Sequence, residues 1–277
     1  WDMIQFCLRL GDKPQACITT TPRNNPALRA LLNRPSTVRI HALTTANRAN
    51  LADDFLEEIE VRYAGTRLGR QEMDGELLTD VAGSLWSFSK LSALQIEAAP
   101  PSDRIVVAID PPITGRKGSD DCGIVICGVT MKGSPQDWQV TVLEDATMSA
   151  ASPNAWAKAA IAAMDRHGAD RLVAEVNQGG EMVETILRQE SPLVSFRAVN
   201  AIKGKVLRAE LISSLYEQGR VKHLRGLSSL EDRMCQMTIC GYEGRGSPDR
   251  VDALVWAIHD LMIELAKHWR NPRRRHL

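Results

Sequence analysis

Long apolar runs and an excess of charge of either sign are both missing from this sequence. Its 34 basic and 34 acidic residues cancel, which excludes a uniformly basic nucleic-acid coat but leaves room for a local basic groove. The longest apolar stretches fall well short of the ~20 residues that a membrane-spanning helix needs, and the amino end shows no signal segment. With 44% hydrophobic and 25% charged residues, the 277-residue chain has the composition of a globular protein with one or two domains.

Paired cysteines are missing as well. The six cysteines contain no C-x-x-C pair, so the sequence offers no zinc knuckle. Cys122 and Cys127 lie five residues apart on one predicted strand and therefore face opposite sides. We expect buried, reduced thiols, as in a cytosolic protein.

The first 75 residues have the pattern of part of an α/β unit. The chain begins at Trp1 rather than Met, inside a predicted helix, which suggests a piece of a longer protein. Residues 76–100 break the rhythm and end in an Ala- and Pro-rich stretch, which predicts a linker. The elements predicted before the linker are helices over Trp1–Leu10, Pro26–Leu32 and Asn50–Tyr63 and strands over Gln15–Thr19 and Val38–Ala42.

Residues 101–277 have the pattern of a single α/β domain. Three strands come first and helices alternate with strands after them, an order that predicts a mixed sheet flanked by helices. The predicted strands are Arg104–Asp110, Cys122–Thr130, Trp138–Ala146, Arg171–Val176, Val194–Val199 and Val221–Leu224, and the predicted helices are Pro153–His167, Glu181–Gln189, Gly204–Glu217, Ser228–Met237 and Pro248–Trp269.

Acidic side chains recur where these elements end or begin. Asp110 closes an apolar strand, Glu175 lies near the end of another, and Asp249 and Asp252 fall on one face of the last predicted helix. Carboxylates within a few ångströms of one another cannot all ionise unless a cation joins them. Mg²⁺ with oxygen ligands is the usual answer, and two such ions can activate water against a phosphodiester. The pattern therefore predicts a divalent metal site.

A structural interpretation of the same acids stays open. Asp110 could cap the turn before Pro111, and Glu175 could form a salt bridge to Arg171 or Lys158. Acids in the first turn of a helix are common for dipole reasons alone.

Several short motifs together resemble one protein family. A16-C-I-T-T-T-P-R23 resembles an ATPase coupling motif, and G65-T-R-L-G-R-Q-E-M-D-G-E76 resembles the segment that closes an ATPase domain. D110-P, D120-D-C-G-I, A174-E-V-N and S247-P-D-R-V-D-A-L resemble nuclease motifs. Over essentially its whole length the chain is similar to the large terminase subunit of tailed bacteriophages and gene transfer agents, which packages DNA. This resemblance implies a ribonuclease H-like α/β domain, preceded by part of a P-loop ATPase-type α/β domain.

The resemblance also implies roles for particular residues. Asp110, Glu175 and Asp249 match the metal-binding triad for two Mg²⁺ or Mn²⁺ ions, with Asp110 bridging both. Asp121 matches a further acid at the start of the second strand, and Asp252 falls on the family's D-A-L position as a ligand or helper. The family's His-Asp-Asp is Ser-Pro-Asp here, so whether Asp249 or Asp252 is the closer ligand stays open.

Basic residues in two places are candidates for contact with the DNA backbone. One group lies in the loop after the first strand and the other around the start of the helix at residue 204, where free backbone amides also favour phosphate. The basic tail, residues 270–275, is a third group, for which a disordered chain end is the alternative interpretation and DNA contact is not favoured. The candidates are Arg116, Lys117, Lys203, Lys205 and Arg208.

One element of the family is absent. No G-x-x-x-x-G-K-[ST] loop occurs in these residues, and such a loop is what cradles the phosphates of ATP. We therefore expect ATP hydrolysis only in the parent protein and not in this chain.

The sequence is thus interpreted as a metal-dependent endonuclease that cuts concatemeric DNA in a packaging motor of the bacterial cytoplasm. Residues 1–75 would end the motor ATPase domain, 76–100 would link, and 101–277 would form the nuclease. Expected partners are double-stranded DNA, the portal protein and the small terminase subunit, with an oligomer on the portal and no membrane. The alternatives are another ribonuclease H-like nuclease, such as a junction resolvase or transposase, and a non-catalytic DNA-binding packaging module.

Overall fold

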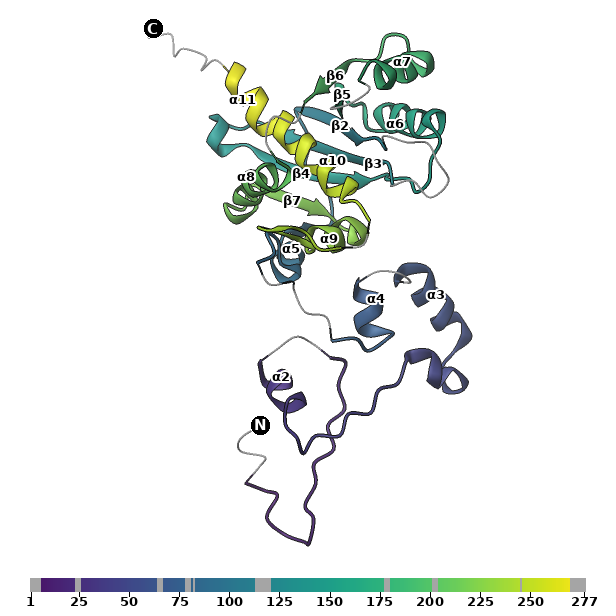
Figure 1. Ribbon diagram of the computed structural model, residues 1–277, viewed down its shortest axis with the longest axis vertical. Coiled ribbons are helices and arrows are strands. Elements are labelled where there is room, and N and C mark those ends of the chain that lie inside the picture. Colours follow the sequence, from purple (N-terminus) through teal and green to yellow (C-terminus); the bar gives the residue numbers. More distant parts are fainter. Residues whose placement is uncertain are drawn as a thin grey trace. The chain divides into compact units, whose positions relative to one another are not determined.

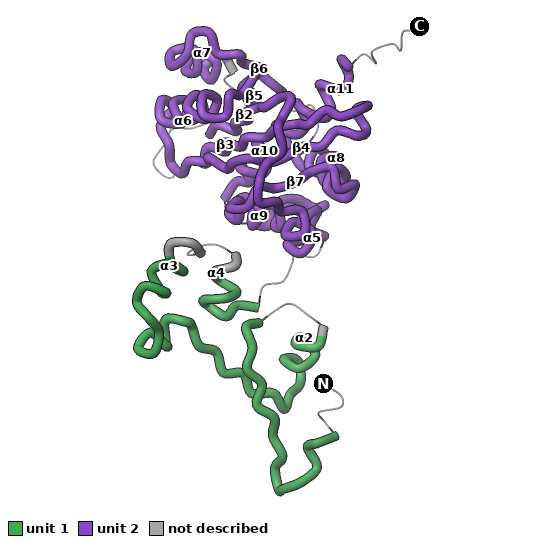
Figure 2. The backbone as a smooth tube through the Cα atoms, turned by 180° about the vertical axis from the view of Figure 1, so that it is seen from behind, with its two compact units in different colours: residues 1–79 green, residues 80–277 purple. Residues whose placement is uncertain are grey.

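The chain forms two compact units, Trp1–Thr79 and Asp80–Leu277, in a computed structural model (Figures 1 and 2). The structure describes residues 6–22, 26–63, 67–77, 81, 83–112, 121–176, 180–200, 204–244 and 246–269.

The first unit contains only helices in its described part. They are α2 (Pro26–Leu32), the 3₁₀ helix η1 (Thr44–Asn50), α3 (Asp53–Tyr63) and α4 (Arg67–Glu72). The strands predicted over Gln15–Thr19 and Val38–Ala42 are wrong, and so is the predicted helix over residues 6–10. Val38 and Ile40 are 87% and 92% exposed. A short apolar alternation forms a strand only where a neighbouring strand supplies hydrogen bonds and a packing surface, and the described residues here supply neither.

The second unit is built on a seven-stranded mixed sheet, as the sequence predicts. The strand order is β1-β7-β4-β3-β2-β5-β6. The first three long strands form an antiparallel meander, and the remaining neighbours pair in parallel. The strands are β1 (Gln95–Ile96), β2 (Arg104–Asp110), β3 (Gly123–Thr130), β4 (Gln139–Asp145), β5 (Arg171–Glu175), β6 (Phe196–Val199) and β7 (Val221–Leu224).

Helices cover both faces of this sheet (Figure 1). Helices α6 (Pro153–His167) and α7 (Gly180–Glu190) share one core with one face of the sheet. The other face packs against α5 (Phe88–Ala93), α8 (Lys205–Glu217), α9 (Ser228–Met234) and α10 (Asp249–Ile258). A small antiparallel pair, β8 (Met237–Thr238) and β9 (Gly241–Tyr242), follows α9 where the sequence predicts a longer helix.

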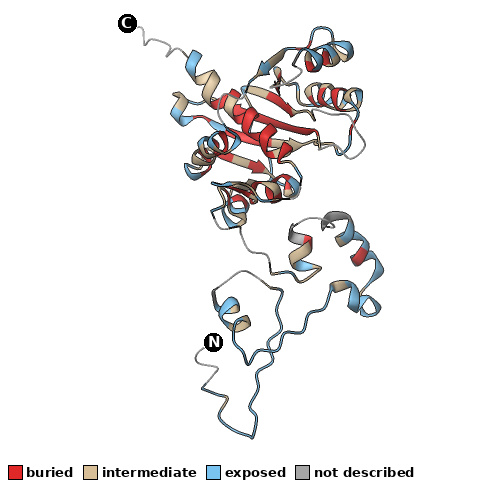
Figure 3. Cartoon of the chain, viewed as in Figure 1, coloured by how far each residue is buried: buried red, intermediate tan, exposed pale blue. Residues whose placement is uncertain are grey.

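The interior strand β2 is buried on both faces (Figure 3). Val106 and Ala108 belong to the core under α10, whereas Val107 and Ile109 belong to the core under α6. A strand covered by helices on both sides reads as a continuous apolar run, which explains why its bounds follow so directly from the sequence.

The last helix consists of three consecutive segments. α10 continues without interruption through the π-helical segment η3 (His259–Glu264) into α11 (Leu265–His268), as the single long helix predicted from the sequence. Within the described residues, no helix combines the length and apolar character needed to span a bilayer.

Most of the predicted linker belongs to the second unit instead. Ser87 caps α5, and β1 pairs in parallel with β7 at the edge of the sheet. Leu91 is only 1% exposed and lies in the core with α9 and β7. Residues 97–101, which include most of the Ala- and Pro-rich stretch, have no helix or strand, whereas Leu85, Trp86, Phe88, Leu91 and Leu94 before them belong to or pack against the core of the second unit.

We predict that Leu91→Ala destabilises the second unit by about 2–5 kcal/mol, because it empties a filled core position. The free energy of unfolding, from urea denaturation monitored by circular dichroism, measures this loss. Ser92→Ala, on the exposed side of the same helix, should leave it nearly unchanged. A loss at Leu91 no larger than that at Ser92 would mean that the segment is a linker after all.

Candidate metal centre

Two of the predicted acids lie at the carboxyl ends of neighbouring strands. β2 and β5 are parallel, and their register pairs Ile109 with Ala174, so Asp110 and Glu175 end the two strands side by side. Asp110 follows Val106 on β2, and Glu175 follows Val173 on β5, each at an even spacing. Even spacing on a strand places both acids on the sheet face covered by α10. Because β2 and β5 are parallel, their carboxyl ends, and with them Asp110 and Glu175, lie at the same edge of the sheet.

The other two acids come from the start of α10. Asp249 and Asp252 are both buried in its first turn. The helix reaches the sheet edge because β3 begins with Gly123, which pairs with Asp110. A Cβ on Gly123 would lie 2.1 Å from the carbonyl oxygen of Asp249, so only glycine permits this approach. Asp110, Glu175, Asp249 and Asp252 are called the acid cluster below.

Two cationic side chains of α8 lie among these carboxylates. Lys205 Nζ is 2.6 Å from Asp252 Oδ2 and about half exposed. Arg208 is 6% exposed, and its Nη2 lies 3.2 Å from Glu175 Oε2 and 3.8 Å from Asp252 Oδ1. The buried charges are thereby partly neutralised, which is the condition for carboxylates to stay in the interior.

Glu175 is held from a second side by Trp256. The indole Nε1 donates a hydrogen bond to Glu175 Oε2 at 2.5 Å, and the guanidinium of Arg208 stacks 4.7 Å from the centre of the same ring. Trp256 and Arg208 therefore fix the carboxylate of Glu175 between them. Composition does not predict that Trp256 and Arg208 hold Glu175. The spacing of Asp249, Asp252 and Trp256, three and four residues apart, does place the indole on the same helix face as the two acids.

Burial and neighbouring charges perturb the pKa values of Asp110 and Asp252. Burial raises the pKa of Asp110 well above its usual value, and the charges of Asp252, Glu175 and Asp249 raise it further against the opposing charge of Lys205. Burial also raises the pKa of Asp252, and Glu175 adds to this, while Lys205 and Arg208 act in the opposite direction.

The same carboxylates also shift the pKa of Lys205. Burial alone would lower the pKa of its ammonium group, but the charges of Asp252, Asp110 and Glu175 outweigh burial and the pKa is raised. The ammonium is therefore held firmly charged beside the carboxylates.

Asp121 shares the same region of the sheet edge. The pKa of the neighbouring Cys122 thiol is raised by burial and then by the charges of Asp110, Asp249 and Asp121. Cys122, Cys127 and Cys235 are buried free thiols, as the sequence predicts, whereas Cys7, Cys17 and Cys240 are exposed, so the prediction of burial is wrong for those three.

The predicted basic residues have different outcomes. Lys205 lies beside the acid cluster with its ammonium group accessible. Arg208 was predicted to contact DNA, whereas its guanidinium is buried against Glu175 and Trp256 and is not on the surface. Its position on α8 points inward, which the charge pattern of the sequence could not reveal. Arg116, Lys117 and Lys203 lie outside the described residues.

The donor set fits a hard divalent cation, although the side chains are not in ligand positions. In the described part of the chain, no three His, Cys, Asp or Glu side chains are arranged to hold a metal ion. The electrostatic coupling of Asp110 to three other carboxylates nevertheless shows a local excess of negative charge. All of its donors are carboxylate oxygens, the preferred ligands of Mg²⁺. Asp110, Glu175, Asp249 and Asp252 are the residues that could hold it.

A mixed sheet with helices on both faces and carboxylates from two strand ends and a helix start defines a ribonuclease H-like α/β domain. The family described as the terminase RNaseH-like domain matches residues 107–261, which is more than half of the chain. The chain belongs to this family. No curated protein sequence matches it at a significant level.

Several solved structures align with the chain. One is the manganese-soaked, inhibitor-bound terminase nuclease domain of human cytomegalovirus, at 17% identity and a TM-score of 0.48, covering 68% of this chain and 99% of that chain. Another is the nuclease domain of the large terminase subunit gp2 of bacterial virus Sf6, at 14% identity, TM-score 0.47 and coverages of 64% and 98%. The large terminase nuclease of the thermophilic phage G20c aligns at 16% identity and TM-score 0.45, with coverages of 64% and 97%.

We predict that Gly123→Ala disrupts the acid cluster. The added methyl group would clash with backbone atoms of Asp249, so the start of α10 must move, at a cost of about 1–3 kcal/mol or more. Chemical denaturation measures the loss. The matched control is Gly204→Ala, where an added Cβ meets nothing within 4 Å; because Gly204 is the N-cap of α8 and Ala is less favourable than Gly there, a loss of about 0.5–1 kcal/mol is expected. Equal losses at both sites would show that α10 does not depend on this contact.

Proposed function

We propose that this chain is the nuclease part of a large terminase that cuts double-stranded DNA with the help of two divalent metal ions. One observation carries the proposal: carboxylates from β2, β5 and α10 meet at one sheet edge closely enough to perturb Asp110. Membership of the terminase RNaseH-like family supports DNA as the substrate.

Asp110, Glu175 and Asp249 would hold the ions, and Asp252 would be a further ligand or helper. When bound, Mg²⁺ or Mn²⁺ would supply an activated water and stabilise the leaving oxygen of the phosphodiester. Glu175 is oriented for this task by Trp256 and Arg208. Asp121, at the same edge, would serve as an outer acid near Cys122.

Lys205 would make contact with the DNA backbone. Its ammonium group is partly exposed and is held charged beside the acids, so it can bind a phosphate oxygen next to the cluster. Arg116, Lys117 and Lys203 stay candidates for further backbone contacts. Arg208 is reassigned from DNA contact to positioning Glu175, because its guanidinium is buried.

The larger biological role rests on the motif resemblance of the first unit. Residues 1–75 would be the end of a motor ATPase domain whose phosphate loop lies in the parent protein. The assembled motor would act on concatemeric DNA in the bacterial cytoplasm, as an oligomer on the portal protein and with the small terminase subunit.

One observation favours a second candidate, a non-catalytic DNA-binding module. Asp252 is paired with Lys205 and Glu175 with Arg208, so two of the four acids are already neutralised by the protein itself. In a degenerate site these pairs would replace the metal rather than make way for it.

Asp110→Asn separates these candidates. It removes one of the proposed metal-holding carboxylates, so metal-dependent cleavage of plasmid DNA should fall at least ~10³-fold while DNA binding persists, since one negative charge fewer faces the phosphates. Because the ionised Asp110 is disfavoured in the fold, the metal-free variant should be no less stable than the wild type.

The measurements are nicking rates in Mn²⁺ and in excess chelator, together with fluorescence anisotropy for binding. Asp165→Asn, an exposed acid on α6, is the matched control and should cut normally. Wild-type nicking that is equally fast in chelator would contradict the metal mechanism. Absence of any wild-type cleavage with intact binding would support the non-catalytic module.

Trp256→Phe tests the positioning of Glu175 independently of cleavage. The variant keeps an aromatic ring for Arg208 to stack on but loses the hydrogen bond to Glu175. We expect Mn²⁺ affinity, measured by isothermal titration calorimetry, to weaken about 10–100-fold, as is typical when a group that orients a ligand is lost. Trp138→Phe, buried elsewhere in the core, is the control and should bind Mn²⁺ normally. Unchanged affinity in Trp256→Phe would mean that Glu175 needs no indole donor.

A further inference from the structure

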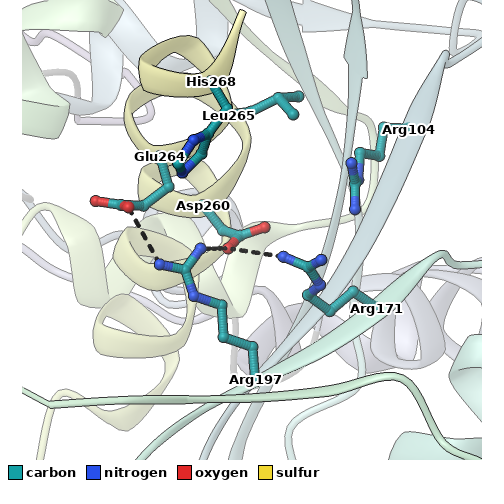
Figure 4. Close-up of a pocket in the computed structure, with 7 residues that line it drawn as sticks. All are labelled: Arg104, Arg171, Arg197, Asp260, Glu264, Leu265 and His268. Atoms are coloured by element: carbon teal, nitrogen blue, oxygen red, sulfur yellow. Dashed lines mark hydrogen bonds and ion pairs between the residues drawn. The ribbon is translucent and has the colours of Figure 1, made fainter.

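A second charged site lies at the opposite end of the strands that carry the acid cluster. β2 runs from Arg104 to Asp110, a separation of roughly 20 Å at about 3.3 Å per residue. The pocket at the Arg104 end has a volume of about 160 Å³. It is lined by Arg104, Arg171, Arg197, Asp260, Glu264, Leu265 and His268 (Figure 4).

Three arginines reach this pocket because of the register of the sheet. Arg171 pairs with Val106 of β2, and Arg197 pairs with Val173 of β5. Arg104 lies two residues before Val106, so all three arginines lie on the face covered by the last helix. Three guanidinium groups on adjacent strands are thereby directed to one place.

The opposite wall comes from the last helix. Asp260, Glu264 and His268 are spaced four residues apart, and the two acids lie in the π-helical segment η3. A short π-helical segment inside an α-helix is uncommon and is frequently found at functional sites.

The two carboxylates are each shared between cations. Asp260 Oδ1 lies 2.7 Å from Arg197 Nη1 and 3.9 Å from Arg171 Nη1. Glu264 lies 3.1 Å from Arg197 Nη2 and 2.5 Å from Lys267 Nζ. Neither acid contacts Arg104, which stands apart from the dashed network in Figure 4.

Arg104 is the unsatisfied member of the group. Within the described residues its guanidinium has no ion pair, and its Nε is buried without a hydrogen-bond partner. Asp103 and Asp170, which directly precede β2 and β5, are engaged elsewhere, because Asp103 accepts from the backbone N–H of Met131 and Asp170 from that of Ile105. An arginine cannot lose its proton to escape this environment.

The chemistry of the pocket therefore favours an anion. Its lining carries three guanidinium groups against two carboxylates. The volume corresponds to about five water molecules, which suits one oxyanion and its hydration but is below the ~300 Å³ of a typical small-molecule site. Planar guanidinium forks match phosphate oxygens in pairs, and a tetrahedral phosphate accepts from several directions at once.

We propose that this pocket is a phosphate-binding site separate from the metal centre, in which Arg104 is the principal donor and Arg171 and Arg197 complete the contacts. The phosphate is either a free phosphate ion or a backbone phosphate of DNA. The second source rests on the proposed function, and it agrees with the sequence R270-N-P-R-R-R275 that follows His268. A backbone contact so far from the acid cluster would hold DNA several base pairs away from the cutting site.

The first experiment titrates the full chain with sodium phosphate at constant ionic strength and follows its melting temperature, with sodium acetate as a parallel titration. Phosphate should raise the melting temperature of the wild type more than acetate does. Arg104→Gln should weaken apparent phosphate affinity about tenfold or more, and Arg104→Lys, which keeps the charge but loses the fork, should lie between them.

Arg225→Gln is the matched control, since it removes an arginine from an exposed ion pair with Glu97 and should respond to phosphate as the wild type does. Duplex DNA binding, measured in chelator, then identifies the source. If DNA supplies the phosphate, Arg104→Gln should reduce the slope of log affinity against log salt by about one. If only free phosphate is bound, the slope stays unchanged while the phosphate response is lost. Neither readout requires cleavage, so the site can be established even if the nuclease proposal fails.

Two results would overturn the proposal. One is a wild-type melting temperature that responds to phosphate no more than to acetate. The other is Arg104→Gln and Arg104→Lys variants whose phosphate response equals that of Arg225→Gln. Should Arg104→Gln not fold, the Arg104→Lys comparison alone decides, because that variant keeps the charge at the site.

Discussion

The mutual repulsion of buried carboxylates at one sheet edge is the constraint on which the second unit depends. Asp110, Glu175, Asp249 and Asp252 are brought together by β2, β5 and the start of α10, which pack in one core. The protein offsets part of the repulsion with Lys205 and Arg208 from α8. It does not offset all of it, since the pKa of Asp110 stays raised after burial is compounded by three like charges. A fold that keeps such an imbalance in its interior gives up stability there, and that is common where groups are arranged for chemistry rather than for packing.

Much of this arrangement can be predicted from sequence, and the reasons are local. β2, α6 and β7 have the predicted bounds because each is framed by unambiguous signals: a two-sided apolar run, a Ser-Pro helix start, or a short apolar strand between turns. The four acids could be named because strand ends and helix starts are visible in a sequence. The predictions that fail are those for segments whose structure depends on a partner distant in the sequence. Val38 and Ile40 alternate like a strand but have no neighbouring strand in the described residues, and the α5 segment resembles a linker because its few apolar residues do not show what they pack on.

The direction of long side chains is the other feature that the sequence does not contain. Arg208 and Lys205 lie three residues apart on α8 and have the same charge, yet one is buried over the Trp256 ring and the other reaches solvent. That difference is set by where α10 lies against α8, and its position depends in turn on the absence of a side chain at Gly123. A glycine at the start of a strand is easily passed over as a turn residue. Here it determines how closely a helix approaches the sheet, and therefore which of two basic residues neutralises the acids.

The last helix connects the two charged ends of the sheet. Its first turn supplies Asp249 and Asp252 to the acid cluster, Trp256 holds Glu175 one turn later, and Asp260 and Glu264 bind Arg171 and Arg197 at the far end. Because a helix transmits an axial shift along its length almost undiminished, ion pairs at the arginine end help to fix the depth at which the acids sit at the other. Asp260 and Glu264 both lie in the π-helical segment η3, so the ion pairs to the arginines are made where the helix departs from regular α-helical winding. The last helix thus connects the acid cluster at one end of β2 and β5 with the arginines at the other end. The placement of the carboxylates therefore depends on the whole helix and not only on its first turn.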